Sequence, residues 1–201
     1  MGNYVNPGNI GFKRINGPDY VDKTMLIDLI NARIGMDKCL VCVSRPRRCG
    51  KSYAEKMLTA YYEASCDSHS LFDDKKIAEC ASYSTHLNQY HVINLDITSF
   101  ISEAKSKKKP LIDVPKMIMS AIHTDLMKID PKLVVCENLN EEISQIVEKE
   151  CGKQFVFIID EWDAMIREAK DDSEAQEAYL NLLGAGLRTV TSPRKLSLPL
   201  I

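Results

Sequence analysis

An apolar run that leads directly into Gly50-Lys51-Ser52 is the feature that most constrains this chain. Residues 39–43 are Cys-Leu-Val-Cys-Val; a loop rich in proline and arginine follows them, and a helical pattern begins at Ser52. Unpaired backbone N–H groups at the start of a helix point toward an anion, and the helix dipole favours its negative charge. The pattern therefore predicts a strand buried on both faces, a phosphate-binding loop and a helix, in that order.

The loop itself supplies the candidate phosphate ligands. Gly50 lets the backbone approach a phosphate closely, Lys51 brings a positive charge to the outer phosphates, and the Ser52 hydroxyl can ligate Mg²⁺. The general pattern of such loops has glycine where this chain has arginine at its first position. The candidate nucleotide-binding residues are Arg45, Pro46, Arg47, Arg48, Cys49, Gly50, Lys51 and Ser52.

A second apolar run, residues 155–159, ends at Asp160-Glu161 and predicts a central parallel strand. An Asp at the tip of such a strand can hold a metal ion through its water shell, and the Glu after it can polarise an attacking water. Both motifs lie at the C-terminal ends of expected strands, where α/β proteins bind their ligands. Glu161 and Lys51 are thus the candidate catalytic residues, and Ser52 and Asp160 the candidate metal ligands.

Strand and helix patterns alternate along the rest of the chain. This alternation predicts an α/β sheet with right-handed crossovers. The lysine-rich segment 104–110 predicts a solvated loop. The other expected elements are helices over 24–34 with Thr24 as cap, from Ser52 to about 64, from Pro115 to about 127, over 141–150 with Asn140 as cap, and after Asp171–Ser173, and a strand over 92–97.

Charge and hydropathy exclude several classes of function. The net charge of -2 and the pI of about 6.1 provide no overall positive field for nucleic acid or an anionic membrane. No stretch approaches the ~20 consecutive apolar residues that span a bilayer. The N-terminus has neither a positive start nor an apolar run, so we expect a cytoplasmic protein without a membrane partner.

The seven cysteines are odd in number and scattered, which is typical of reduced thiols. Cys39 and Cys42 form a C-x-x-C pair that raises the alternative of a zinc or redox site. Alternating side chains of a strand would send these sulfurs to opposite faces, and no second Cys/His pair at metal spacing follows. We therefore favour packing cysteines.

Three segments together resemble the bacterial AAA-ATPase-like family. They are Ser-Arg-Pro-Arg-Arg-Cys-Gly-Lys-Ser at 44–52, Phe-Val-Phe-Ile-Ile-Asp-Glu-Trp-Asp at 155–163 and Tyr-Val-Asp-Lys-Thr at 20–24. The resemblance runs from about residue 4 to about residue 183, and an Arg-Pro-Arg-Arg loop is usual in that family. It implies ATP and Mg²⁺ as ligands, Walker A and Walker B motifs at the two strand ends, and Tyr20, Asp22 and Lys23 near the adenine.

The resemblance also implies an α/β fold of the P-loop NTPase type, additional-strand class: a three-layer sandwich with a parallel sheet. In this class a strand with a polar sensor residue lies between the two motif strands and follows the Asp-Glu strand in sequence. Residues 184–201 do not resemble that continuation, and Pro193 and Pro199 count against a central strand. We expect an AAA-ATPase-like domain over 1–187, incomplete at its C-terminal end, and an atypical tail over 188–201.

Three functions remain open at this point. The first is an ATP-binding module, with ATP hydrolysis expected of the intact family domain. The second is an inactive nucleotide-binding fragment, with self-association through the strand edges that a missing strand would leave unpaired. The third is a nucleic-acid-binding module that uses Arg45, Arg47 and Arg48. Family members often carry a PD-(D/E)XK nuclease-like domain, which we expect to be missing here, so that nucleic acid would be only an indirect partner.

Overall fold

Two parallel strands form the centre of the computed structural model, which describes residues 2–36, 39–44, 49–136 and 138–188. Strand β1 (His91–Asp96) pairs in register with β2 (Phe155–Asp160), so that Asp96 lies beside Asp160 at their C-terminal ends. Both strands are apolar because helices cover both faces of the pair. The expected α/β class with a parallel sheet is confirmed, and the three-layer P-loop sandwich stays a prediction.

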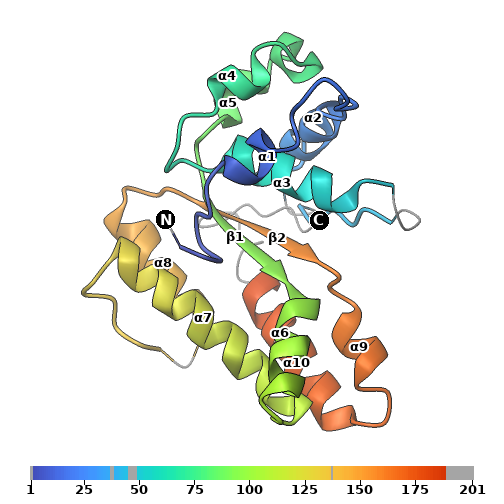
Figure 1. Ribbon diagram of the computed structural model, residues 1–201. Helices are drawn as coiled ribbons and strands as arrows, with labels where there is room; N and C mark the ends of the chain where they lie inside the picture. Colours follow the sequence, from blue (N-terminus) through green and yellow to red (C-terminus); the bar gives the residue numbers. More distant parts are fainter. Residues whose placement is uncertain (1, 37–38, 45–48, 137, 189–201) are drawn as a thin grey trace.

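Alternate residues of the strands pack against two different groups of helices (Figure 1). Val92, Val156 and Ile158 join a core with α3 and the short helices of the N-terminal half. Ile93 and Phe157 join the larger core with the helices of the C-terminal half. The first group is α1 (Ile10–Lys13), α2 (Met25–Asn31), α3 (Lys51–Tyr62), α4 (His69–Phe72), η1 (Lys76–Glu79) and α5 (Tyr83–His86); the second is α6 (Ile97–Ser106), η2 (Leu111–Asp113), α7 (Val114–Ile129), α8 (Leu139–Lys149), α9 (Ala164–Glu168) and α10 (Ser173–Arg188).

Helix α3 links the first core to the predicted phosphate-binding loop. Its C-terminal half is buried, whereas its first turn is half-buried or exposed. The Tyr62 hydroxyl donates to Asn31 Oδ1 at 2.8 Å, and the Tyr61 hydroxyl donates to the Tyr83 carbonyl at 2.8 Å. Burial raises the pKa of both phenols, so they stay neutral hydrogen-bond donors. These contacts fix the helix, and therefore the position of its N-terminal end.

The N-terminal segment covers the outer edge of β1. Asn94 N–H donates to the Tyr4 carbonyl and Asn6 N–H donates to the Val92 carbonyl, both at 2.8 Å. Asp125 of α7, whose relative exposure is 3%, holds this segment: Oδ2 accepts from the amides of Tyr4 at 2.7 Å and Val5 at 3.1 Å. The segment satisfies the backbone groups that a strand edge would otherwise leave unpaired.

We expect Asp125→Asn to destabilise the fold at neutral pH by about 2 kcal/mol, because hydrogen bonds to a buried carboxylate are lost or weakened. Burial raises the pKa of Asp125, but hydrogen bonds from Lys128, Tyr4 and Val5 outweigh burial, and the net shift is downward. A lowered pKa contributes stability above the unfolded value of about 4, and this stability is lost as pH falls through the folded value.

Urea unfolding of wild type and Asp125→Asn from pH 7 down to pH 3 measures this contribution. The difference in unfolding free energy is expected to shrink below about pH 4. Asp113→Asn is the matched control, because Asp113 precedes α7, the helix that carries Asp125, and its side chain makes no capping hydrogen bond. A difference that stays constant over the pH range would show that Asp125 does not act through its charge.

The strand expected at residues 39–43 is absent: residues 39–44 are described without a strand assignment. A strand needs a hydrogen-bonded neighbour, and in the described part of the chain β2 pairs with β1 alone. Cys42, Val43 and Ser44 line a cavity together with Ile158 and Ile159 of β2. Cys39 is buried and Cys42 exposed, so the two thiols lie in different surroundings.

Several helix details also differ from expectation. Helix α6 includes residues 104–106 of the lysine-rich segment expected to be a loop, because lysine is a good helix former and Lys107 pairs with Glu103 one turn earlier. Helix α8 begins at Leu139, and its cap is Asn138, whose side chain accepts from the Asn140 amide. The expected helix over 24–34 is shorter, and the Thr24 hydroxyl donates to Asp22 instead of capping it.

The domain limits at residues 1 and 187 stay a prediction from the sequence. The atypical tail lies outside the described residues beyond Arg188, where α10 ends. Self-association through strand edges also stays a prediction. In the part of the chain that the structure describes, no helix is long and apolar enough to cross a bilayer.

Candidate functional site

The N-terminal end of α3 has the geometry of an anion-binding turn. Gly50 precedes the helix in the left-handed region, with φ of 80°, and a Cβ there would lie 2.9 Å from Lys23 Nζ. The left-handed conformation therefore favours glycine, whereas the close atom is the end of a flexible lysine side chain that could move aside. Lys23 Nζ donates to the Cys49 carbonyl at 2.7 Å and so holds the end of the loop. Four of the candidate ligands lie outside the described residues: Arg45, Pro46, Arg47 and Arg48.

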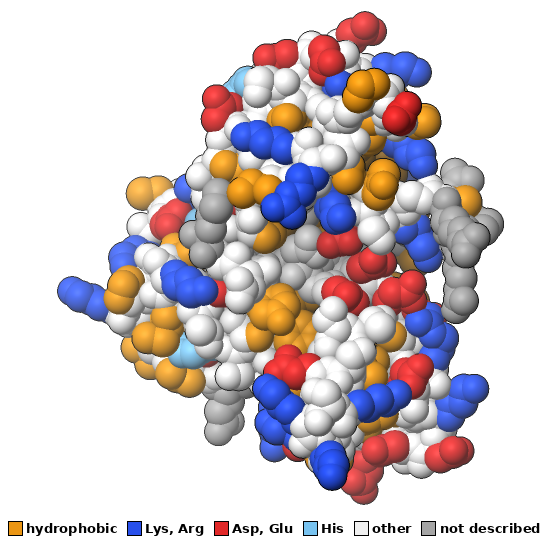
Figure 2. Space-filling view, in the orientation of Figure 1, with side chains coloured by type: hydrophobic (Ala, Val, Ile, Leu, Met, Phe, Trp, Pro, Cys, Tyr) orange, Lys and Arg blue, Asp and Glu red, His pale blue; other side chains and the backbone are white. Residues whose placement is uncertain are grey.

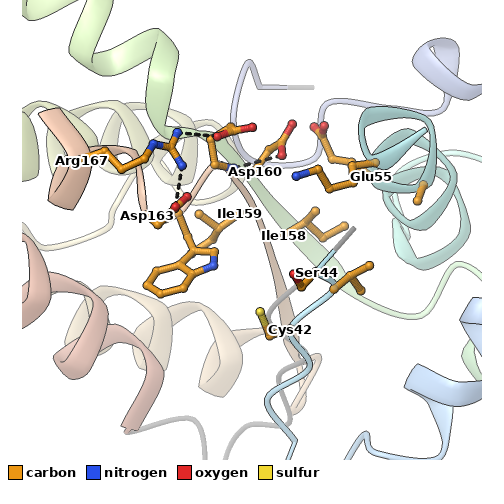
Figure 3. Close-up of a pocket in the computed structure, with 13 residues that line it drawn as sticks. Cys42, Ser44, Glu55, Ile158, Ile159, Asp160, Asp163 and Arg167 are labelled. Carbon is orange, nitrogen blue, oxygen red and sulfur yellow. Dashed lines mark hydrogen bonds and ion pairs between the residues drawn. The ribbon is translucent and has the colours of Figure 1, made fainter. Parts of the chain in front are cut away.

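A cavity of about 260 Å³ lies between α3, residues 42–44 and the C-terminal end of β2 (Figure 3). Lys51, the first residue of α3, lines it together with Asp160 and Glu161, three of the residues singled out from the sequence. Lys51 has no ion pair within the part of the chain that the structure describes. Its charge is therefore not neutralised by a described carboxylate, and an anionic ligand can use it.

Ser52 lies beside Asp160, which lines this cavity. The distance from Ser52 Oγ to Asp160 Oδ2 is 3.4 Å, long for a hydroxyl–carboxylate hydrogen bond. The other carboxylate oxygen, Oδ1, accepts from the Glu161 amide at 3.0 Å. The bond from the Glu161 amide orients the carboxylate. Because the contact between Ser52 Oγ and Asp160 Oδ2 is long, both of these oxygen atoms can turn toward a shared cation. The structure thus brings together the two predicted metal ligands.

Glu161 lies in a tight turn between β2 and α9. Its backbone adopts φ of 51°, the left-handed region that non-glycine residues seldom occupy. Its Oε2 contacts the guanidinium of Arg167 at 2.6 Å, and a second nitrogen of the same guanidinium contacts Asp163 at 2.5 Å. Figure 3 shows Arg167 reaching from α9 toward the turn and contacting both carboxylates.

Acidic side chains predominate around the cavity. Figure 2 shows them grouped near the C-terminal ends of the strands, and the lining includes Glu55, Asp160, Glu161 and Asp163 against Lys51 and Arg167. Burial raises the pKa of Glu55, a hydrogen bond from Asn94 opposes this shift, and the charges of Asp160 and Asp96 add to it. A bound cation would relieve this repulsion.

Sequence reasoning missed two charged residues of the site, Glu55 and Arg167. Glu55 lies one turn beyond Lys51 on α3, and Arg167 lies four residues after Asp163 at the start of α9. Helical spacing indicates both neighbours once the helix starts are known. Lys23 was expected near an adenine, whereas here it holds the loop carbonyl.

The other two residues expected near the adenine make structural contacts. Asp22 accepts from the Thr24 hydroxyl and from the Lys76 amide, and so connects the segment before α2 to η1. The Tyr20 hydroxyl contacts Met57 Sδ at 3.2 Å, and its ring packs edge-on against Phe12. These contacts occupy the polar atoms of both side chains, so neither residue is required to face a ligand.

The fold and site define a class of protein. It is an α/β protein in which a glycine precedes a helix, and the serine in the first turn of that helix lies beside an aspartate at the C-terminal end of a parallel strand. A family model described as a predicted AAA-ATPase matches residues 10–192, so the chain belongs to this AAA-ATPase-like family. Comparison with curated proteins and with solved structures gave no match.

Proposed function

We propose that this chain binds ATP together with Mg²⁺ in the cavity at the N-terminal end of α3. The observation that carries the proposal is the juxtaposition of Gly50-Lys51-Ser52 with Asp160, in which Ser52 Oγ lies 3.4 Å from Asp160 Oδ2. Membership of a family of predicted AAA-ATPases supports ATP as the nucleotide. The expected roles of the individual residues follow from their positions.

The phosphates would lie at the start of α3. The first-turn amides of the helix have no partner within the helix, and the left-handed Gly50 lets a phosphate approach them. Lys51 lines the cavity and adds a full positive charge beside these amides. Together they would provide hydrogen bonds and charge for the terminal phosphates, while Lys23 donates to the loop carbonyl of Cys49.

Mg²⁺ fits the oxygen atoms that the structure brings together. This ion prefers oxygen ligands and usually keeps several waters, so it needs only one or two protein groups and the phosphates of its nucleotide. The Ser52 hydroxyl and the Asp160 carboxylate would hold it, directly or through water. When bound, the ion neutralises phosphate charge. It would also offset the excess of carboxylates around the cavity.

Hydrolysis is the further step expected of the family. Glu161 follows Asp160 and lines the same cavity, so its carboxylate would accept a hydrogen bond from a water and increase the water's nucleophilicity. A nucleotide-binding chain without turnover is the alternative that the sequence leaves open. The nucleic-acid alternative depends on arginines outside the described residues.

Calorimetric titration with ATP, with and without Mg²⁺, tests the binding proposal. For the wild type, Mg²⁺ is expected to increase affinity by about tenfold or more, equivalent to ~1.4 kcal/mol. Asp160→Asn is expected to lose most of this gain and to retain the weaker Mg²⁺-independent binding, because a neutral amide is a poor ligand for a hard cation.

Asp96→Asn is the matched control for this titration. Asp96 occupies the same register position on β1 as Asp160 on β2, but its carboxylate caps α6 and accepts from the Thr98 and Ser99 amides. The Mg²⁺ gain should therefore survive in Asp96→Asn. An equal loss in both variants, or a gain undiminished in Asp160→Asn, would contradict the assignment of Asp160 as a metal ligand.

A further inference from the structure

We propose that Arg167 is a positioning residue that fixes the carboxylate of Glu161 relative to Asp160. The consequence of this positioning, the orientation of a water, rests on the proposed function. The contact between Arg167 and Glu161 itself is present in the chain without nucleotide. Arg167 NH2 lies 2.6 Å from Glu161 Oε2, and NH1 lies 2.5 Å from Asp163 Oδ2. One planar group thus bridges two carboxylates on the same turn.

The backbone of the turn is held by other contacts. The Ala164 amide donates to the Glu161 carbonyl at 2.8 Å, which closes the turn at the start of α9. The Tyr179 hydroxyl of α10 donates to the Trp162 carbonyl at 2.7 Å, and Tyr179 is fully buried. The free part of Glu161 is therefore its side chain, which has several rotatable bonds and is 38% exposed. Arg167 supplies the contact that restricts it.

The bridge geometry suits positioning. Asp163 lies one helical turn before Arg167 and fixes one side of the guanidinium, so the other side presents a defined donor to Glu161. Only Oε2 of Glu161 is engaged; within the part of the chain that the structure describes, Oε1 has no hydrogen-bond partner. Oε1 is then the atom that can accept from a water in the cavity.

The ion pairs of Arg167 are too exposed to contribute much to the stability of the fold. The side chains of Arg167, Glu161 and Asp163 are between 38% and 49% exposed, and ion pairs this exposed contribute little to stability. All three side chains line the cavity, and the stability of the fold does not require them to do so. Loss of the bridge should accordingly alter the turn and turnover, and leave unfolding almost unchanged.

The first experiment measures turnover and binding separately in the full chain. Arg167→Gln is expected to lower kcat by about tenfold, a part of the ~10²-fold that a positioned base provides, and to change the dissociation constant of Mg²⁺-ATP by less than about twofold. Arg167→Lys is expected to recover part of the loss, since a point charge can reach one carboxylate but does not bridge two. In a Glu161→Gln background, Arg167→Gln should lower kcat no further.

The second experiment needs no nucleotide. Trp162 is the only tryptophan of the chain and lies between the two bridged carboxylates, so its fluorescence reports on this turn. Arg167→Gln is expected to increase acrylamide quenching of Trp162 by about 1.5-fold or more, because the turn opens locally more often. Glu168→Gln is the matched control: Glu168 lies on the same helix as Arg167, and the substitution breaks its ion pair with Lys105 of α6, which has similar exposure.

The outcomes separate this inference from the proposed function. Unchanged quenching in Arg167→Gln, or an equal rise in Glu168→Gln, would overturn the positioning role. A loss of kcat by Arg167→Gln that is just as large in the Glu161→Gln background would also overturn it. A wild-type chain that does not bind Mg²⁺-ATP would instead contradict the proposed function, and the quenching comparison would still decide whether Arg167 fixes the turn.

Discussion

Replacing Lys51 by alanine is expected to weaken ATP binding by roughly 10²-fold, about 3 kcal/mol, because a charged hydrogen-bond donor to the phosphates is removed from a partly desolvated site. Lys51 is half-buried and lines the cavity, and it has no ion pair with another described residue. Its loss should therefore leave the fold intact. Calorimetric titration with Mg²⁺-ATP gives the affinity, and urea unfolding gives the stability of the same preparation.

Lys56→Ala is the matched control for this comparison. Lys56 lies on the same helix, is exposed and does not line the cavity. Affinity in this variant should stay within about twofold of wild type, since a charge at the surface is largely screened by salt. Unchanged affinity in a well-folded Lys51→Ala variant would remove the phosphate-binding assignment of the loop.

Glu161→Gln is expected to lower the rate of ATP hydrolysis by about 10²-fold or more and to keep ATP affinity within about twofold. The substitution retains the shape of the side chain and removes the negative charge that polarises water. Asp160 and Lys51, which would contact the ion and the phosphates, are unchanged. The measurement is kcat from a steady-state phosphate-release assay, beside the dissociation constant from titration.

Glu168→Gln is again the suitable control, because Glu168 is an exposed carboxylate of α9 that pairs with Lys105 and does not line the cavity. A loss of binding in Glu161→Gln as large as that in Lys51→Ala would show that Glu161 acts on the ligand and not on a water. Hydrolysis at the wild-type rate in Glu161→Gln would place the water-polarising group elsewhere.

Local sequence patterns predicted those parts of the fold that depend on local chemistry. The apolar run before Asp160 forms β2, and the run before Asp96 forms β1, because both are buried on both faces. The run 39–43 is also apolar but does not form a strand. Its outcome depends on a hydrogen-bonded neighbour, which composition does not encode.

The candidate site likewise contains residues that a local sequence pattern predicts and residues that it does not predict. Lys51, Ser52 and Asp160 could be found from sequence because each follows a motif with a physical requirement at that position. Arg167 and Glu55 could not, since their roles depend on where α9 and α3 place them relative to β2. The left-handed backbone of Glu161 also gives no local signal, because glutamate seldom adopts it.

Helix α3 carries Lys51 at one end and the buried Tyr61 and Tyr62 at the other, so ligand binding and the stability of the first core are thermodynamically linked. A ligand at ten times its dissociation constant that binds only the folded chain adds ~1.4 kcal/mol to the free energy of unfolding. Because the helix is one hydrogen-bonded unit, this gain extends to amides that lie several turns away from the phosphates. By the same linkage, a substitution among these tyrosines that destabilises the fold enough to populate the unfolded chain would lower apparent nucleotide affinity without touching the nucleotide.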